Sequence, residues 1–176
     1  MARIGSRLVL VALAAALAAA PALAGRASTN RASMPAPDRS VLVQLNAIRS
    51  QHGLVTLKPN AQLAAAAAEH SSDMLAHGYF AHSSFNGGAF WERLARYTAG
   101  ARHGGWSVGE NLLWSAPDVD AVHALKLWMA SPEHRANILN PDWRQIGIAA
   151  VNSPSAPGTY GGRDVTVVTT DFGVRR

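Results

Sequence analysis

The segment that decides the fold is residues 128–139, WMASPEHRANIL, in a chain of 176 residues. Ser131 followed by Pro132 is typical of a helix start, because serine favours the capping position and proline fits the first helical position. The residue before a proline avoids the helical region, so a preceding helix has to end before Pro132. We therefore predict a short helix that carries His134 in its first turn, directly after a longer helix.

Two further segments carry candidate functional side chains. Residues 78–83, GYFAHS, follow a long helix predicted over 60–77, so His82 is expected on a loop held by a rigid element. Residues 109–112, GENL, place a carboxylate beside a glycine within an apolar stretch. This pattern indicates that Glu110 is a buried acid at a tight backbone position.

The remaining pattern places helices first and strands last. Apolar side chains recur at helical spacing in four segments before the short helix, 38–53, 60–77, 89–97 and about 117–130. Alternation and β-branched residues predict strands over 145–151 and 165–172, with a loop over 152–162 and a short β-prone run at 54–57. Helices followed by strands favour an α+β fold over a repeated βαβ fold.

The first 24 residues have the features of a secretory signal peptide. Two arginines precede an apolar run of 13 residues, 8–20, and residues 22–24, ALA, fit the small-x-small cleavage pattern. The run is shorter than the roughly 20 residues of a membrane-spanning helix, although an uncleaved membrane anchor is the alternative. We expect cleavage near Ala24 and a secreted or periplasmic protein.

The rest of the chain divides into a flexible leader, 25–37, and one domain, 38–176. The leader consists mainly of Gly, Ser, Thr, Asn, Pro and Ala with few large apolar groups, whereas the domain has enough apolar residues for a core of its own. The chain contains no cysteine, so no disulfide stabilises it. Its 16 basic residues against 11 acidic ones are scattered, and a nucleic-acid partner, which would need a basic stripe, is not expected.

The ordered set of motifs resembles the CAP superfamily in its bacterial, SCP-like form, which includes cysteine-rich secretory proteins, antigen 5 and pathogenesis-related 1. Its elements are Y-F-x-H, G-E-N-L, W-x-x-S-P-x-H-R-x-N-I-L and a closing D-F-G at 171–173. The resemblance covers about residues 38–173 and implies a three-layer α-β-α sandwich with a central antiparallel sheet. It also implies a cleft with two histidines, His82 and His134, and with Glu110 as one acid. Ser131 stands where the family's second acid would be.

Three functions are compatible with these residues. The favoured one is a non-catalytic binding module, a monomer, whose cleft of His82, Glu110, Ser131 and His134 contacts a lipid, a cell-wall polymer or another protein. The alternative is a metal-assisted hydrolase, with His82 and His134, and tentatively Glu110, holding zinc or another divalent cation. Glu110 is then also the candidate catalytic base. The third is a structural domain in which the same side chains form only a hydrogen-bonded network.

Overall fold

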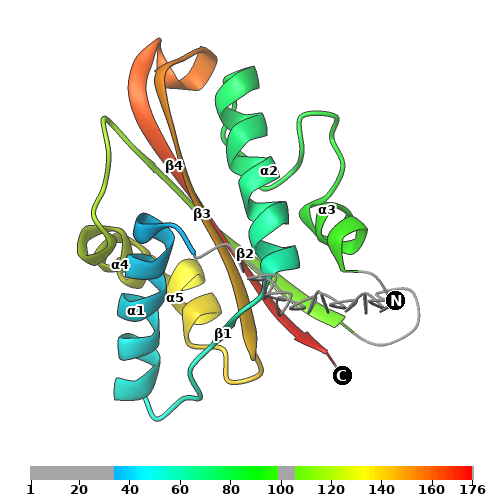
Figure 1. The fold of residues 1–176 in the computed structure, drawn as a ribbon, viewed down its shortest axis with the longest axis vertical. Coiled ribbons are helices and arrows are strands. Elements are labelled where there is room, and N and C mark those ends of the chain that lie inside the picture. Colours follow the sequence, from blue (N-terminus) through cyan, green and yellow to red (C-terminus); the bar gives the residue numbers. More distant parts are fainter. Residues whose placement is uncertain (1–33, 99–105, 176) are drawn as a thin grey trace, which may run out of the picture. The chain divides into compact units, whose positions relative to one another are not determined.

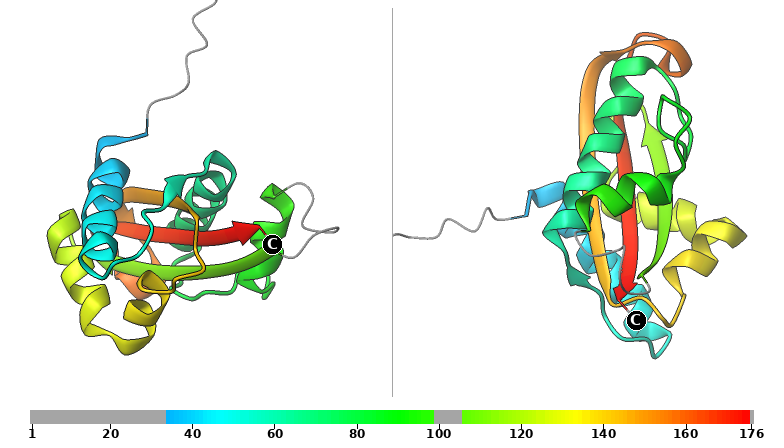
Figure 2. Two further views of the ribbon diagram at one scale, coloured as in Figure 1. Left: turned by 90° about the horizontal axis from the view of Figure 1, so that it is seen from below. Right: turned by 90° about the vertical axis from the view of Figure 1, so that its right-hand side faces the viewer.

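A four-stranded sheet, in the order β1-β3-β4-β2, forms the centre of the domain. We describe a computed structural model, which covers residues 34–98 and 106–175. Three long antiparallel strands make up most of the sheet, and in Figure 2 (right) they stand side by side with β4 in the middle. Their bounds, with those of the short fourth strand, are β1 Lys58–Pro59, β2 Trp106–Ser115, β3 Gln145–Ala156 and β4 Arg163–Arg175.

Helices cover both faces of this sheet, so the domain is the expected three-layer α+β sandwich. Figure 1 shows helices on both sides of the strands. On the first face are α2, Ala61–His77, and α3, Phe90–Tyr97. On the second are α1, Ala36–Gln51, α4, Ala121–Ala130, and α5, Pro132–Ile138.

Local sequence signals explain where the helices begin and end. The Asn60 side chain accepts hydrogen bonds from the backbone of Gln62 and Leu63 and so caps α2, which ends at Gly78 with φ 70°. Asp120 caps α4 by accepting from the backbone N–H of His123, so this helix begins later than the predicted start near residue 117. α5 begins at Pro132 as predicted, with Ser131 at the capping position.

Other elements also differ from the sequence-based predictions. α1 begins at Ala36, and the buried Asp38 side chain accepts from the Ala150 N–H at 2.9 Å instead of capping the helix. Residues 54–57 form no strand, because the Asn46 side chain binds both backbone groups of Leu57. β1 adds a parallel pair with β3 to an otherwise antiparallel sheet. The predicted loop over 152–162 shortens, because β3 and β4 pair as far as Ala156 and Arg163.

β2 was not predicted, since its sequence, WSVGENLLWS, lacks a clear alternation of polar and apolar residues. It lies at one edge of the sheet and pairs with β4 over its whole length. Two side chains cover carbonyls of β2: Trp128 Nε1 donates to Leu112 O at 3.0 Å, and Asn137 Nδ2 donates to Glu110 O at 3.1 Å. The strand edge is therefore closed by α4 and α5 at the point where the candidate site lies.

The predicted signal peptide, 1–24, and leader residues 25–33 lie outside the described residues. In the part of the chain that is described, no helix has the length and apolarity required to cross a bilayer.

Candidate functional site

His82 lies on the loop after α2, and three contacts hold this loop. The buried His70 donates from Nε2 to Ala81 O at 2.9 Å, since a carbonyl can only accept. Arg93 on α3 donates to His82 O at 3.4 Å and to the hydroxyl of Ser84 at 3.1 Å. At the start of the loop, Gly78 packs so closely on the backbone of Gly158 that a Cβ would lie 2.8 Å from it. His70 is therefore a core histidine with a hydrogen-bond partner.

Glu110 projects from β2 toward the face covered by α2 and α3, and its carboxylate is fully buried. Oε1 accepts from His82 Nδ1 at 2.8 Å, and Oε2 is paired with the guanidinium of Arg93, which is 1% exposed. The prediction of a buried acid is therefore confirmed, and its two side-chain donors are a histidine and an arginine. A buried carboxylate requires such donors, because burial without partners costs several kcal/mol.

The tight backbone position predicted for this motif is at Gly109. Its ideal Cβ would lie 2.5 Å from Asn137 Oδ1 and 2.9 Å from the Trp143 ring. These side chains come from α5 and the segment after it, so the missing side chain lets the two pack against the edge of the sheet. The glycine in this motif therefore correctly predicted a tight backbone position. The position is tight because Asn137 and Trp143 pack directly against Gly109.

His134 lies in the first turn of α5 and is half-buried. Its Nδ1 is 2.8 Å from Ser131 Oγ, so Ser131 contacts the histidine and makes no side-chain cap to the helix. Asn111 on β2 donates to His134 O at 3.2 Å and accepts from Asn137 at 3.0 Å, which ties the helix to the strand. Burial first, and then the nearby His82, lowers the pKa of His134, so its imidazole is neutral at pH 7.

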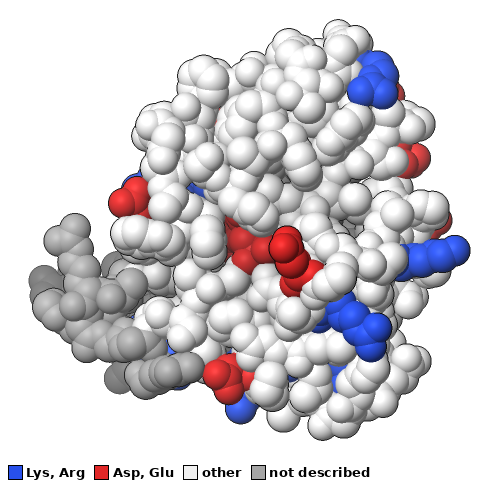
Figure 3. Space-filling view, turned by 180° about the vertical axis from the view of Figure 1, so that it is seen from behind, with Lys and Arg blue, Asp and Glu red and all other residues white. Residues whose placement is uncertain are grey.

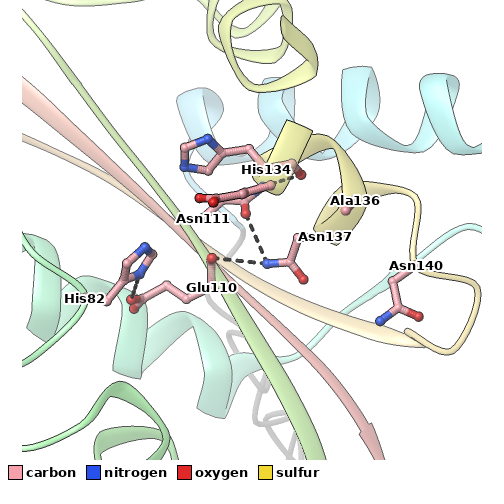
Figure 4. A pocket seen from close by; sticks show the side chains of 8 residues that line it. His82, Glu110, Asn111, His134, Ala136, Asn137 and Asn140 are labelled. Atoms are coloured by element: carbon pink, nitrogen blue, oxygen red, sulfur yellow. Dashed lines mark hydrogen bonds and ion pairs between the residues drawn. The ribbon is translucent and has the colours of Figure 1, made fainter. Parts of the chain in front are cut away.

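These side chains line a cavity of about 300 Å³ at the β2 edge (Figure 4). The lining is polar except for one alanine and consists of His82, Glu110, Asn111, Glu133, His134, Ala136, Asn137 and Asn140. Ser131 is not part of this lining and acts on it only through His134. Figure 3, from the side opposite to Figure 1, shows acidic side chains near the centre of that face and only separate basic ones.

Both imidazoles are fixed through Nδ1. Because a carboxylate only accepts, His82 Nδ1 carries a proton, which leaves Nε2 as the ring nitrogen that can face a ligand. Both oxygens of Glu110 are engaged, so this residue is suited to orienting His82 rather than to binding a cation directly. Within residues 34–98 and 106–175, no three His, Cys, Asp or Glu side chains form a group that could hold a metal ion.

The comparison with protein families decides the assignment. The model of the cysteine-rich secretory protein family, CAP, matches residues 42–171. The chain belongs to this family. This chain contains no cysteine, so its stability comes from the core and from polar contacts and not from disulfides.

Individual relatives are bacterial CAP proteins. The uncharacterized protein YkwD of Bacillus subtilis is 32% identical over 139 residues, which are 77% of this chain and 52% of YkwD. The structure of an extracellular protein containing a SCP domain from Bacillus anthracis str. Ames is 31% identical with TM-score 0.60, over 80% of this chain and 40% of that one. Thus the chain spans about half the length, or less, of these relatives.

A further structure supports the fold alone. An outer surface protein from Borrelia burgdorferi has TM-score 0.63 at 16% identity, and the match covers 78% of this chain and 92% of that one. The two proteins therefore share the fold although few of their residues are identical.

The structure brings His82 and Glu110 into contact and places His134 in the same cavity, whereas binding of a metal stays a prediction. Sequence reasoning missed the amide groups of the lining, although Asn111 and Asn137 belong to the quoted motifs. It also missed two buried charged residues behind Glu110, Arg93 and Asp171. Only the helical spacing of Arg93 from Phe90 and Tyr97, which places it on an apolar face, could have indicated a buried guanidinium.

Proposed function

We propose that this CAP domain is an extracellular, non-catalytic binding module whose cleft holds a segment of a cell-wall polymer. The observation that carries the proposal is the internal use of Glu110, whose two oxygens are engaged by Arg93 and His82. The cleft therefore offers no free buried carboxylate as a base. Its other side chains are imidazoles and amides, which bind polar groups by hydrogen bonds, and one exposed acid, Glu133.

The polarity of the lining favours a wall polymer over a lipid. Sites for apolar ligands are lined mainly by hydrophobic and aromatic side chains, whereas Ala136 is the one apolar residue of this lining. Glycan hydroxyls and peptide amides can form hydrogen bonds with the imidazole nitrogens and with the Asn140 side chain. An extracellular place for the module is supported by the signal-like first 24 residues and by the SCP-domain relative, which is described as extracellular.

Binding to isolated peptidoglycan tests the proposal. We expect the His134→Ala variant to bind about tenfold more weakly than wild type, the loss of roughly one hydrogen bond. Val122→Ala on α4 is the matched control, because this side chain is exposed and is not among the residues that line the cleft. Equal retention of wild type and His134→Ala, or tighter binding to anionic lipid vesicles than to peptidoglycan, would contradict it.

One observation favours a second function, a metal-assisted hydrolase. A histidine whose Nδ1 proton is bound by a buried carboxylate, as in His82–Glu110, is also the arrangement of a metal-binding histidine. His82 and His134 would hold the divalent cation through Nε2, and the cation would supply Lewis acidity when bound. Among the described residues, none of those that line the cleft is a serine, threonine or cysteine nucleophile. Peptidase or esterase turnover that requires added zinc and is lost in His134→Ala would favour this function over binding alone.

A further inference from the structure

A second carboxyl group lies directly behind Glu110. Asp171 on β4 pairs with Glu110 on β2 and with Gly147 on β3, and it has no exposed surface. Side chains of directly paired residues project to the same face of a sheet, so both carboxyl groups lie between the sheet and the helices α2 and α3. Gly147 leaves room here for α2, since a Cβ at this position would lie 2.0 Å from the Leu63 backbone.

The charges around Asp171 do not balance if both carboxyl groups are ionised. Arg93 is the buried cation of this cluster, and its guanidinium is paired with Glu110. His70 from α2 also lies in this cluster, and burial lowers the pKa of its imidazole, so it is neutral at pH 7. Among the described residues, no ion pair joins Asp171 to a basic side chain. An ionised Asp171 would be a second negative charge with no counterion in a dry environment.

Hydrogen bonding leads to the same result. Neither oxygen of Asp171 has a donor within the described part of the chain, and Arg93 Nε has no acceptor there. The neighbouring group is the Glu110 carboxylate, which can only accept. A hydrogen bond between the two therefore needs a proton on Asp171. Burial first, and then the adjacent charge of Glu110, raises the pKa of Asp171 well above its usual value.

We propose that Asp171 is a positioning residue of the cleft: its neutral carboxyl group donates to the Glu110 carboxylate and fixes the acceptor that orients His82. Glu110 then receives three donors from three elements, namely Asp171 on β4, Arg93 on α3 and His82 on the loop after α2. The inference deepens the proposed function, because it explains how the cleft holds its more exposed imidazole in one orientation before a ligand arrives. It does not depend on which ligand binds.

The test reads the His82 ring itself by nitrogen-15 NMR of the full domain at neutral pH, together with the melting temperature. Asp171→Asn keeps a donor of the same shape without a charge, whereas Asp171→Leu removes the donor. Thr169→Val is the matched control, since Thr169 is buried on the same face of β4 and bonds to Ser71 at 2.8 Å. The readout is the proton on His82 Nδ1, which the bond to Glu110 shields from exchange.

We expect Asp171→Asn to keep the Nδ1 proton signal and to melt no lower than wild type. Asp171→Leu should lose the signal, whereas Thr169→Val should lower the melting temperature and keep the signal. If Asp171→Asn melts clearly lower and loses the signal, Asp171 is an ionised partner of Arg93 and the proposal is wrong. If Asp171→Leu folds and keeps the signal, the residue has no positioning role. Neither outcome depends on peptidoglycan binding, so the proposed function is tested separately.

Discussion

The two faces of the central sheet are built in different ways. The face under α1, α4 and α5 has a continuous apolar core, with Leu45, Trp128 and Phe172 among its fully buried side chains. Its buried charged side chains, Asp38 and Arg49, bind backbone groups and not each other. The face under α2 and α3 has smaller apolar clusters and, near its centre, the buried charged residues Arg93, Glu110 and Asp171. Burying charges costs free energy even when they are paired, so this composition is unfavourable for stability alone. The difference indicates that one face provides most of the apolar core, whereas the other holds the buried charges that orient the His82 side of the cleft.

The largest effect should follow from removing the buried cation. Arg93→Met removes the buried cation and leaves Glu110 with His82 and the proposed donor Asp171, and we expect a loss of about 3–5 kcal/mol in the free energy of unfolding, measured by urea denaturation. The double variant Arg93→Met, Glu110→Met should recover most of this loss. Arg96→Met is the control, since Arg96 is paired with Glu69 at the surface and such a pair contributes at most about 1 kcal/mol. Equal effects of the two single changes would show that the buried pair has no special role.

A change on the apolar face should affect stability without affecting the cleft. Leu45→Ala truncates a side chain with no exposed surface, and we expect a loss of about 2–5 kcal/mol in the free energy of unfolding. The His82 ring should keep its Nδ1 proton. Val43→Ala on the same helix is the control, because Val43 is exposed and its truncation should change stability by less than about 0.5 kcal/mol. Loss of the His82 signal in Leu45→Ala would mean that the two faces are coupled.

The smallest expected effect is a pH dependence from Asp171. Folding raises the pKa of this acid, so the folded state binds the proton more tightly than the unfolded state. The stability that results is fully present below the ordinary pKa of 3.8 and is lost as pH rises through the folded value. Asp171→Asn cannot ionise, so its melting temperature relative to wild type should increase from pH 4 toward neutrality. A constant difference between the two across this range would contradict the raised pKa.

Local patterns in the sequence were sufficient for the helices and insufficient for the polar face. Asn60, Gly78 and Pro132 mark helix ends through contacts within a few residues, and their predicted positions agree with the structure. β2 and Asp171 depend on pairing with distant segments. Asp171 follows a run of β-favouring residues and gives no local sign that it lies beside Glu110, since only the register of β2 and β4 brings them together.

The candidate site shows the same division. The three motifs indicated the family resemblance, and that resemblance predicted that His82, Glu110 and His134 share one cleft. The resemblance could not indicate that Arg93 neutralises Glu110, or that Ser131 serves His134 as a hydrogen-bond partner. These contacts depend on side-chain geometry. They change the interpretation of Glu110 from a free acid to a fixed acceptor.

The most direct test of the account is NMR mapping of a soluble peptidoglycan fragment on the isotope-labelled domain. The account predicts concentration-dependent shifts at His82, His134 and Asn140, which line the cleft, and unchanged signals at the exposed Val43 and Val122 of the apolar face. Shifts centred on α1 and α4, with the cleft signals unchanged, would contradict it. So would the absence of any shift at millimolar fragment.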